Sequence, residues 1–210
     1  MIIVTGSGRS GTSITTKLLQ YAGADFPNSS DWEDEVRAGI ENHDVVTINK
    51  MIFSVNNKND YYGYDWLLRA EEQRSVDLLQ FIIQKFSSDW FGKFVKDPLF
   101  SKTLNVWART DSKIEHVVIC VRDVWAVVDS ALETGRGFST TKPMTQELIT
   151  QEINARLGYL FRHLIYNSIP YTIVRYEHFE EDVEKLLTVL KLDVGKGKEF
   201  INKEFKQIQR

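Results

Sequence analysis

The chain has 210 residues, of which 42% are hydrophobic and 26% are charged, and its formal net charge is -3 at pH 7. A chain of this length can bury roughly 70% of its unfolded surface, which predicts a single domain over residues 1–210. The acidic balance argues against DNA or RNA as a partner, because such binding needs a basic face of clustered lysine and arginine.

Cysteine content and hydropathy indicate the redox compartment and whether the chain crosses a membrane. Cys120 is the only cysteine, which excludes an intrachain disulfide and a thiolate metal cluster and fits a reducing compartment. The first apolar run covers four residues, and no later run approaches the roughly twenty of a membrane span. We therefore predict a soluble, cytoplasmic protein with no membrane partner, and the oligomeric state stays open.

The N-terminal part of the chain predicts a strand, a glycine-rich loop and a helix. The β-branched run IIVT at 2–5 is typical of a buried parallel strand, and apolar positions within 13–23 share one helical face. Residues 24–35 are polar and acidic and contain proline, which indicates a surface loop. The apolar spacing then predicts helices over 43–55 and 64–86.

Three further strands are predicted downstream, separated by helical patterns. The strands are expected at 93–96, 116–121 and 171–176, and the helices at 103–109, 124–133 and 145–167. A glycine turn and a basic helix are expected over 194–210. This alternation predicts a three-layer α/β fold with a mostly parallel central sheet, whose binding loops lie at the carboxyl ends of the strands.

The stretch VTGSGRSGTS at 4–13 fits two known phosphate motifs imperfectly. As G-x-G-x-x-G it suggests a dinucleotide site, but no second strand with an acid for the ribose follows about twenty residues later. As the G-x-x-x-x-G-K-S/T loop of nucleotide triphosphatases it lacks the lysine, because Thr12 stands at that position.

Both motifs share backbone N–H groups and a helix N-terminus that face a tetrahedral anion. The loop therefore predicts a phosphate or sulfate site, although a purely structural tight turn is a less favoured alternative. The residues assigned to this site are Gly8, Arg9, Ser10, Gly11, Thr12 and Ser13.

A second anion site is suggested by HVVICVRDVWAVVDS at 116–130. Arg122 follows a predicted strand, and Ser130 lies eight residues later, two turns along a predicted helix. If that helix packs back against the strand end, both side chains can hold one anionic group. A surface ion pair of Arg122 with Asp123 or Asp129 fits the spacing equally well.

Four motifs in order give the chain a resemblance to sulfotransferases that use 3′-phosphoadenosine 5′-phosphosulfate (PAPS). They are GSGRSGTS at 6–13, KDPLF at 96–100, VRDVWAVVDS at 121–130 and VRYEHF at 174–179. The resemblance, closest to bacterial-type members, covers residues 1 to about 190 and implies a P-loop-like nucleotide-binding sulfotransferase fold.

The resemblance implies that PAPS is the donor and 3′-phosphoadenosine 5′-phosphate (PAP) the product, with no metal required. The first loop would hold the 5′-phosphosulfate, and Arg122 and Ser130 would hold the 3′-phosphate. The acceptor would be a hydroxyl or amine of a small molecule or glycan. The R-K-G triplet of the cytosolic animal enzymes is absent near the C-terminus, and Lys196 and Lys198 are candidates to replace part of it.

The acceptor side is assigned from GIENHDVVTINKMIF at 39–53, which is similar to a G-x-x-E…VV-x-x-N stretch of bacterial-type members, with one residue fewer between Gly39 and Glu41. Glu41 is the first candidate for the catalytic base, and His43 is the second because imidazole titrates near neutrality. Lys96 is assigned to the sulfonate or the bridging oxygen. A solvent-facing acid, a surface histidine and a Lys96–Asp97 pair are the respective structural alternatives.

The remaining expectations concern the VRYEHF motif and two alternative functions. Arg175 and Glu177 of VRYEHF are expected to bind each other or to stabilise the fold. A P-loop kinase of a small metabolite is a rival function, disfavoured by the absent loop lysine. A non-catalytic nucleotide-binding protein of the same fold is the other alternative.

Overall fold

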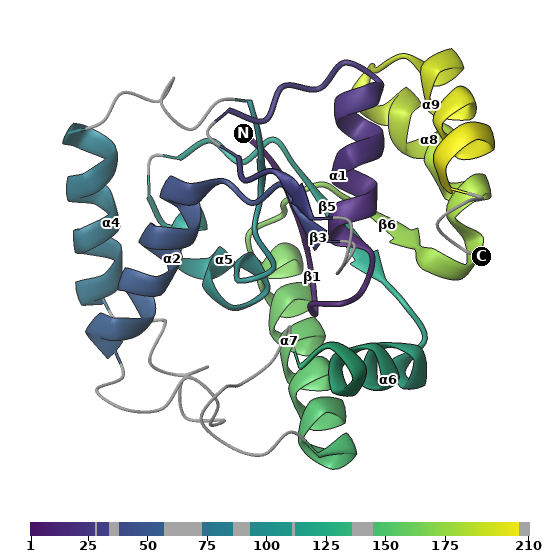
Figure 1. Cartoon of the computed structure of the whole chain (residues 1–210). Helices are drawn as coiled ribbons and strands as arrows, with labels where there is room; N and C mark the ends of the chain where they lie inside the picture. Colours follow the sequence, from purple (N-terminus) through teal and green to yellow (C-terminus); the bar gives the residue numbers. More distant parts are fainter. Residues whose placement is uncertain are drawn as a thin grey trace.

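The centre of the fold is a four-stranded, all-parallel sheet in the order β4-β1-β5-β6 (Figure 1). The computed structural model describes residues 1–27, 29–33, 38–56, 73–85, 93–110, 112–135 and 145–205. The strands are β1 (Ile2–Gly6), β4 (Phe94–Lys96), β5 (His116–Val121) and β6 (Tyr171–Arg175). The predicted α/β class and parallel sheet are confirmed.

Helices cover both faces of this sheet because its strands alternate apolar side chains between the faces. Ile2 and Val4 pack in one core cluster with Leu18, whereas Ile3 packs in a second cluster with Leu104 and Leu160. The helices of the first face are α1 (Thr12–Tyr21), α8 (Phe179–Leu190) and α9 (Val194–Phe200), followed by η4 (Ile201–Phe205). Those of the second are α2 (His43–Asn56), α4 (Gln73–Lys85), α5 (Phe100–Ala108) and α7 (Gln146–Tyr166).

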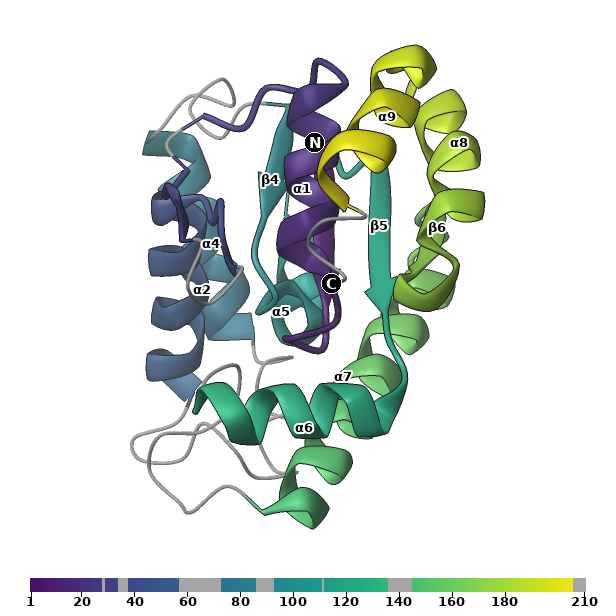
Figure 2. The same cartoon turned by 45° about the vertical axis from the view of Figure 1, so that its right-hand side comes forward.

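One helix lies beyond the carboxyl end of the sheet rather than over a face. This helix, α6 (Val124–Thr134), begins directly after β5 and packs beside α7 (Figure 2). Its first turn is capped by Asp123, whose Oδ1 accepts a hydrogen bond of 3.0 Å from the backbone N–H of Ala126. The end of the sheet where the strands finish is therefore bordered by helix α6.

Two segments differ from the predicted elements. Within the stretch expected to be a loop and just after it, β2 (Trp32–Glu33) pairs antiparallel with β3 (Ala38–Gly39). The glycine turn predicted near the C-terminus is wrong, because helix α9 includes both glycines of VGKGK. Asp193 caps this helix, and a Cβ atom at Gly197 would collide with the side chain of Leu187. The close approach of α8 therefore requires glycine inside α9.

Helix α4 begins at Gln73 within the described residues, so the first part of the helix predicted over 64–86 lies outside them. Helix α8 was not among the predicted elements. No helix in the described ranges has both the length and the apolar character that crossing a membrane requires.

Candidate functional site

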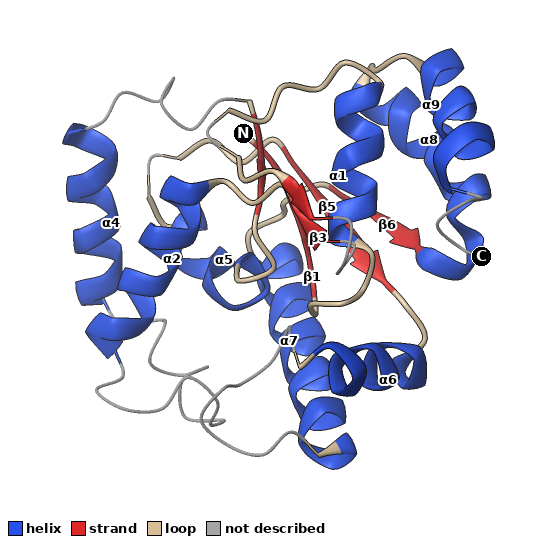
Figure 3. Cartoon of the chain, in the orientation of Figure 1, coloured by secondary structure: helices blue, strands red, loops and turns tan. Residues whose placement is uncertain are grey.

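The candidate residues come together at the carboxyl edge of the sheet. Strand β1 lies between β4 and β5, and the chain forms β4 on one side of it before β5 on the other (Figure 3). In open α/β sheets, such a reversal of strand order leaves a crevice at the carboxyl ends where ligands bind. The glycine loop, Lys96, Arg122 and Tyr176 all lie at or just after strand ends at this edge.

The glycine loop between β1 and α1 bends through left-handed backbone conformations. Gly8 has a φ of 85° and Gly11 a φ of 92°, which glycine adopts without a steric penalty. Arg9 has a φ of 54°, a conformation that costs a residue with a Cβ atom roughly 1–2 kcal/mol. Its Nε donates to Oγ of Ser130 at 3.1 Å, so helix α6 helps to hold this backbone shape.

The N-terminus of α1 is arranged as an anion site would require. Gly11 is the N-cap residue and makes no side-chain cap, and the first turn of the helix contains no acidic residue. The first N–H groups and the positive end of the helix dipole therefore face the loop without a side-chain acceptor from the cap. Ser10 is 1% exposed, and its Oγ has no hydrogen-bond partner in the described part of the chain.

Arg122 lies beside this loop, and no acidic side chain of the described residues pairs with it. Its Cζ is 4.5 Å from the centroid of the Tyr176 ring, and its buried Nε has no hydrogen-bond partner among the described residues. Asp123 caps helix α6 instead of pairing with Arg122. Within the described ranges, Arg122 therefore forms no ion pair with Asp123 or Asp129, which was the alternative to an anion site.

Tyr176 connects Arg122 to the glycine loop, and the sequence analysis gave it no role. A Cβ atom at position 11 would lie 2.8 Å from Cδ2 of Tyr176, so the ring packs directly against Gly11. The ring also meets Phe205 of η4 at a centroid distance of 5.8 Å. An aromatic residue at the end of the strand predicted over 171–176 was the available signal, since the strand ends form the site.

The neighbours of Tyr176 in VRYEHF stabilise the fold, but not by pairing with each other. Arg175 binds Asp182 through Nη2 and Oδ1 at 2.7 Å. Glu177 accepts a hydrogen bond of 2.9 Å from the backbone N–H of Asp123. The expected pair of Arg175 with Glu177 is therefore wrong, while the alternative of a role in the fold holds.

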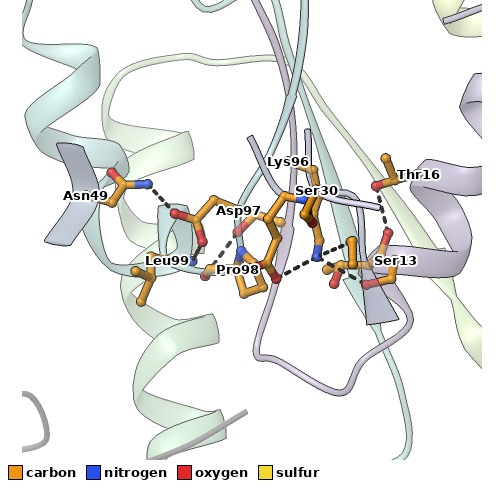
Figure 4. A network of polar contacts seen from close by, with 12 residues as sticks. Ser13, Thr16, Ser30, Asn49, Lys96, Asp97, Pro98 and Leu99 are labelled. Carbon is orange, nitrogen blue, oxygen red and sulfur yellow. Dashed lines mark hydrogen bonds and ion pairs between the residues drawn. The ribbon is translucent and has the colours of Figure 1, made fainter. Parts of the chain in front are cut away.

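Lys96 joins the loop to the acceptor-side residues. Its Nζ donates to Oε1 of Glu41 at 2.8 Å, to Oγ of Ser13 at 3.1 Å and to the backbone oxygen of Gly39 at 3.0 Å (Figure 4). All three donors of the ammonium are thereby engaged. Lys96 is buried, whereas the Glu41 side chain is 42% exposed, so the carboxylate is the part of this cluster that solvent or a ligand reaches.

Asp97 belongs to a separate buried network rather than to a pair with Lys96. It accepts hydrogen bonds from Nδ2 of Asn49 at 2.8 Å and from the backbone N–H of Leu99 at 2.9 Å (Figure 4). Oδ1 of Asn49 accepts in turn from Trp107 at 2.8 Å. Burial raises the pKa of Asp97 to about 6. This network fixes the turn that follows β4 and was not predicted.

Three other candidates are located less favourably. His43 opens α2 with an exposed side chain, and no hydrogen bond or ion pair within the described ranges joins its imidazole to the loop or to Lys96. Helix α9, with Lys196 and Lys198, packs at the far end of α1, where Asp193 N–H donates to the oxygen of Ala22 at 3.2 Å. The glycine loop lies at the opposite end of α1 from this contact.

No family model matches the chain, and no curated protein matches it. The class that the fold and the site define is an α/β protein with a glycine loop and several cationic side chains at the carboxyl edge of a parallel sheet.

Proposed function

We propose that the protein is a PAPS-dependent sulfotransferase with a P-loop-like fold. The observation that carries this proposal is the guanidinium of Arg122, which lies beside the glycine loop and has no carboxylate partner within the described residues. A half-buried cation without such a partner favours an anionic ligand. Together with the loop it provides two separate anion sites at one edge, which suits a nucleotide that carries a 3′-phosphate and a phosphosulfate.

In this proposal the loop binds the 5′-phosphosulfate. The N–H groups at the start of α1 and the buried hydroxyl of Ser10 donate to its oxygens, and Arg9 adds positive charge. Arg122 and Ser130 bind the 3′-phosphate. The hydrogen bond between Arg9 and Ser130 links the residues of the two anion sites.

Transfer requires the acceptor oxygen or nitrogen to attack sulfur in line with the departing phosphate. The new bond to sulfur forms as the bond between sulfur and the bridging oxygen breaks, and PAP leaves with that electron pair. Glu41 accepts the acceptor proton, a role that contributes about 10² to 10⁴-fold in rate. Lys96 contacts both Ser13 of the loop and Glu41, which suits it to stabilise the charge on the bridging oxygen.

In this mechanism, Lys96 has to exchange one of its hydrogen bonds within the protein for a hydrogen bond to the ligand. Because its three donors are engaged, Lys96 reaches the sulfonate or bridging oxygen only by exchanging one of these bonds. The bond to Ser13 is the natural one to exchange, since Ser13 then donates to the donor phosphate itself. His43, the second candidate base, has no supporting contact within the described residues.

Calorimetric titration with PAP, AMP and ATP tests the proposal. We expect PAP to bind at least tenfold more tightly than AMP, and we expect Arg122→Ala to remove that preference while AMP binding stays within about twofold. Equal affinity for PAP and AMP would contradict the proposal. Tighter binding of ATP with magnesium would favour the kinase, and PAP binding without sulfuryl transfer to any hydroxyl or amine acceptor would favour the non-catalytic alternative.

A further inference from the structure

A buried ion cluster lies behind the glycine loop. Arg156 of α7 donates through Nη1 to the backbone oxygen of Ser7 at 2.9 Å and through Nε to Oε1 of Glu152 at 2.8 Å. Lys102 of α5 forms an ion pair with the same oxygen of Glu152. Arg156 and Lys102 are both buried. The sequence analysis gave none of these three charged side chains a role.

Burying these charged side chains costs folding free energy, because the charges lose their hydration. Burial, together with the nearby Arg156, lowers the pKa of Lys102 to about 7. Burial alone would raise the pKa of Glu152, but Arg156 and Lys102 lower it below its usual range. Replacing buried ion pairs with apolar residues is often neutral or stabilising, so stability is a weak explanation for this cluster. The hydrogen bond from Arg156 to Ser7 of the glycine loop is therefore the informative feature.

That contact determines how the loop presents its first N–H group. The oxygen of Ser7 and the N–H of Gly8 belong to one trans peptide, in which the two groups point in opposite directions. Arg156 holds the oxygen toward α7, and α7 packs on the face of the sheet opposite to α1. The N–H of Gly8 is thereby turned away from α7, toward the side of the loop where α1 begins.

We infer that Arg156 is a positioning residue of the anion site, held in place by Glu152 and Lys102. It touches the loop backbone and not the ligand, and it acts by fixing the peptide between Ser7 and Gly8. The inference rests on the proposed function only in taking the loop as the site of the 5′-phosphosulfate. Arg156 lies 149 residues along the chain from Ser7, whose backbone oxygen it binds.

The test compares Arg156→Met and Arg156→Lys with the wild type in PAP and AMP titrations, well below the melting temperature of each variant. Because both nucleotides place a 5′-phosphate in the loop, we expect Arg156→Met to weaken both by about tenfold and to leave their ratio unchanged. Arg156→Lys should recover part of the loss. Arg162→Met, at an exposed position on the same helix, is the matched control and should match the wild type.

The outcomes separate this inference from the proposed function. Wild-type affinities in Arg156→Met would overturn the inference while leaving a PAP preference intact. A loss confined to PAP would also overturn it, since that would assign Arg156 to the 3′-phosphate. Without any PAP preference in the wild type, a tenfold loss of AMP binding would support the inference and contradict the sulfotransferase.

Two further results complete the test. A wild-type protein that binds neither nucleotide would overturn both proposals. If Arg156→Met does not fold, Glu152→Gln takes its place, because it weakens the support of Arg156 and keeps an oxygen that can accept its hydrogen bond. We then expect about a threefold loss for both nucleotides. Wild-type affinities in both Glu152→Gln and Arg156→Lys would contradict the inference.

Discussion

The donor side of the candidate site, comprising residues 8–13, Arg122, Ser130 and Tyr176, differs from the Lys96 side, comprising Glu41, Asn49, Lys96 and Asp97. On the donor side, Ser10 Oγ and Arg122 Nε are buried without a hydrogen-bond partner in the described part of the chain. On the Lys96 side, the ammonium and the Asp97 carboxylate are bonded to protein groups.

This difference predicts how much binding free energy each side gains from a ligand. A buried hydrogen-bonding group without a partner costs roughly 1–3 kcal/mol of stability. An anion bound at the donor side would recover this free energy. A group that is already bonded gains little from a ligand in the ground state. We therefore expect the donor side to determine nucleotide affinity and the Lys96 side to determine the rate of transfer.

The largest effect is expected from Lys96→Met. In the proposed mechanism, loss of the ammonium removes the charge that stabilises the bridging oxygen, and we expect kcat to fall about 10³-fold, which corresponds to about 4 kcal/mol. PAP affinity should change by less than about threefold. Release of PAP from PAPS, with an active hydroxyl or amine acceptor, measures the rate, and Lys50→Met at an exposed position of α2 is the control. A strong loss of PAP binding with an unchanged rate would reverse the division between the two sides.

Asp97, on the Lys96 side, should make the free energy of unfolding depend on pH. Its pKa in the folded protein is about 6, compared with an ordinary value of 3.8, so between these pH values the folded state holds a proton that the unfolded state has lost. The free energy of unfolding therefore decreases as pH rises from about 4 to about 6, by about 3 kcal/mol in all for this group.

Urea denaturation across this pH range measures the effect. Asp97→Asn should lack this part of the pH dependence, whereas Asp129→Asn, at an exposed position of α6, should follow the wild type. Parallel curves for wild type and Asp97→Asn would show that the buried carboxylate does not hold the proton. Burial would then not raise the pKa of Asp97.

A smaller effect is expected from Arg122→Lys on the donor side. Lysine retains the charge but loses the planar fork and stacks less well on Tyr176, so PAP affinity should fall about 5- to 30-fold. AMP affinity should stay within about twofold, because AMP lacks the 3′-phosphate. Calorimetry with both nucleotides gives the ratio, and Arg162→Lys is the exposed control. An equal loss for both nucleotides would move Arg122 to the 5′ end of the ligand.

The two sides also differ in how far the sequence could predict them. The glycine loop is a local pattern of strand, glycines, hydroxyls and helix, and β1 and α1 were predicted close to their observed bounds. The strands at 94–96, 116–121 and 171–175 were recognisable for the same reason. Backbone conformation and apolar periodicity depend on neighbouring residues, which the sequence states directly.

Contacts between distant elements could not be predicted in this way. Arg156 lies on a helix whose pattern explains its apolar face but not a bond to the oxygen of Ser7. Asn49 matches a motif position, yet nothing in its spacing indicates a hydrogen bond to Asp97. Such contacts depend on how α2, α5 and α7 pack over the sheet, which periodicity leaves open.

The smallest effect is expected from Tyr176→Leu, which tests whether the ring tunes the donor side. Leucine can fill part of the space beside Gly11 but offers Arg122 no aromatic face. A cation–π contact of a partly buried arginine is worth about 0.5–1 kcal/mol, so PAP affinity should fall about two- to fivefold. Tyr176→Phe retains the ring and should bind PAP as the wild type does. If Phe and Leu weaken binding equally, the hydroxyl rather than the ring supports the nucleotide, and the preorganisation of Arg122 must come from elsewhere in the donor side.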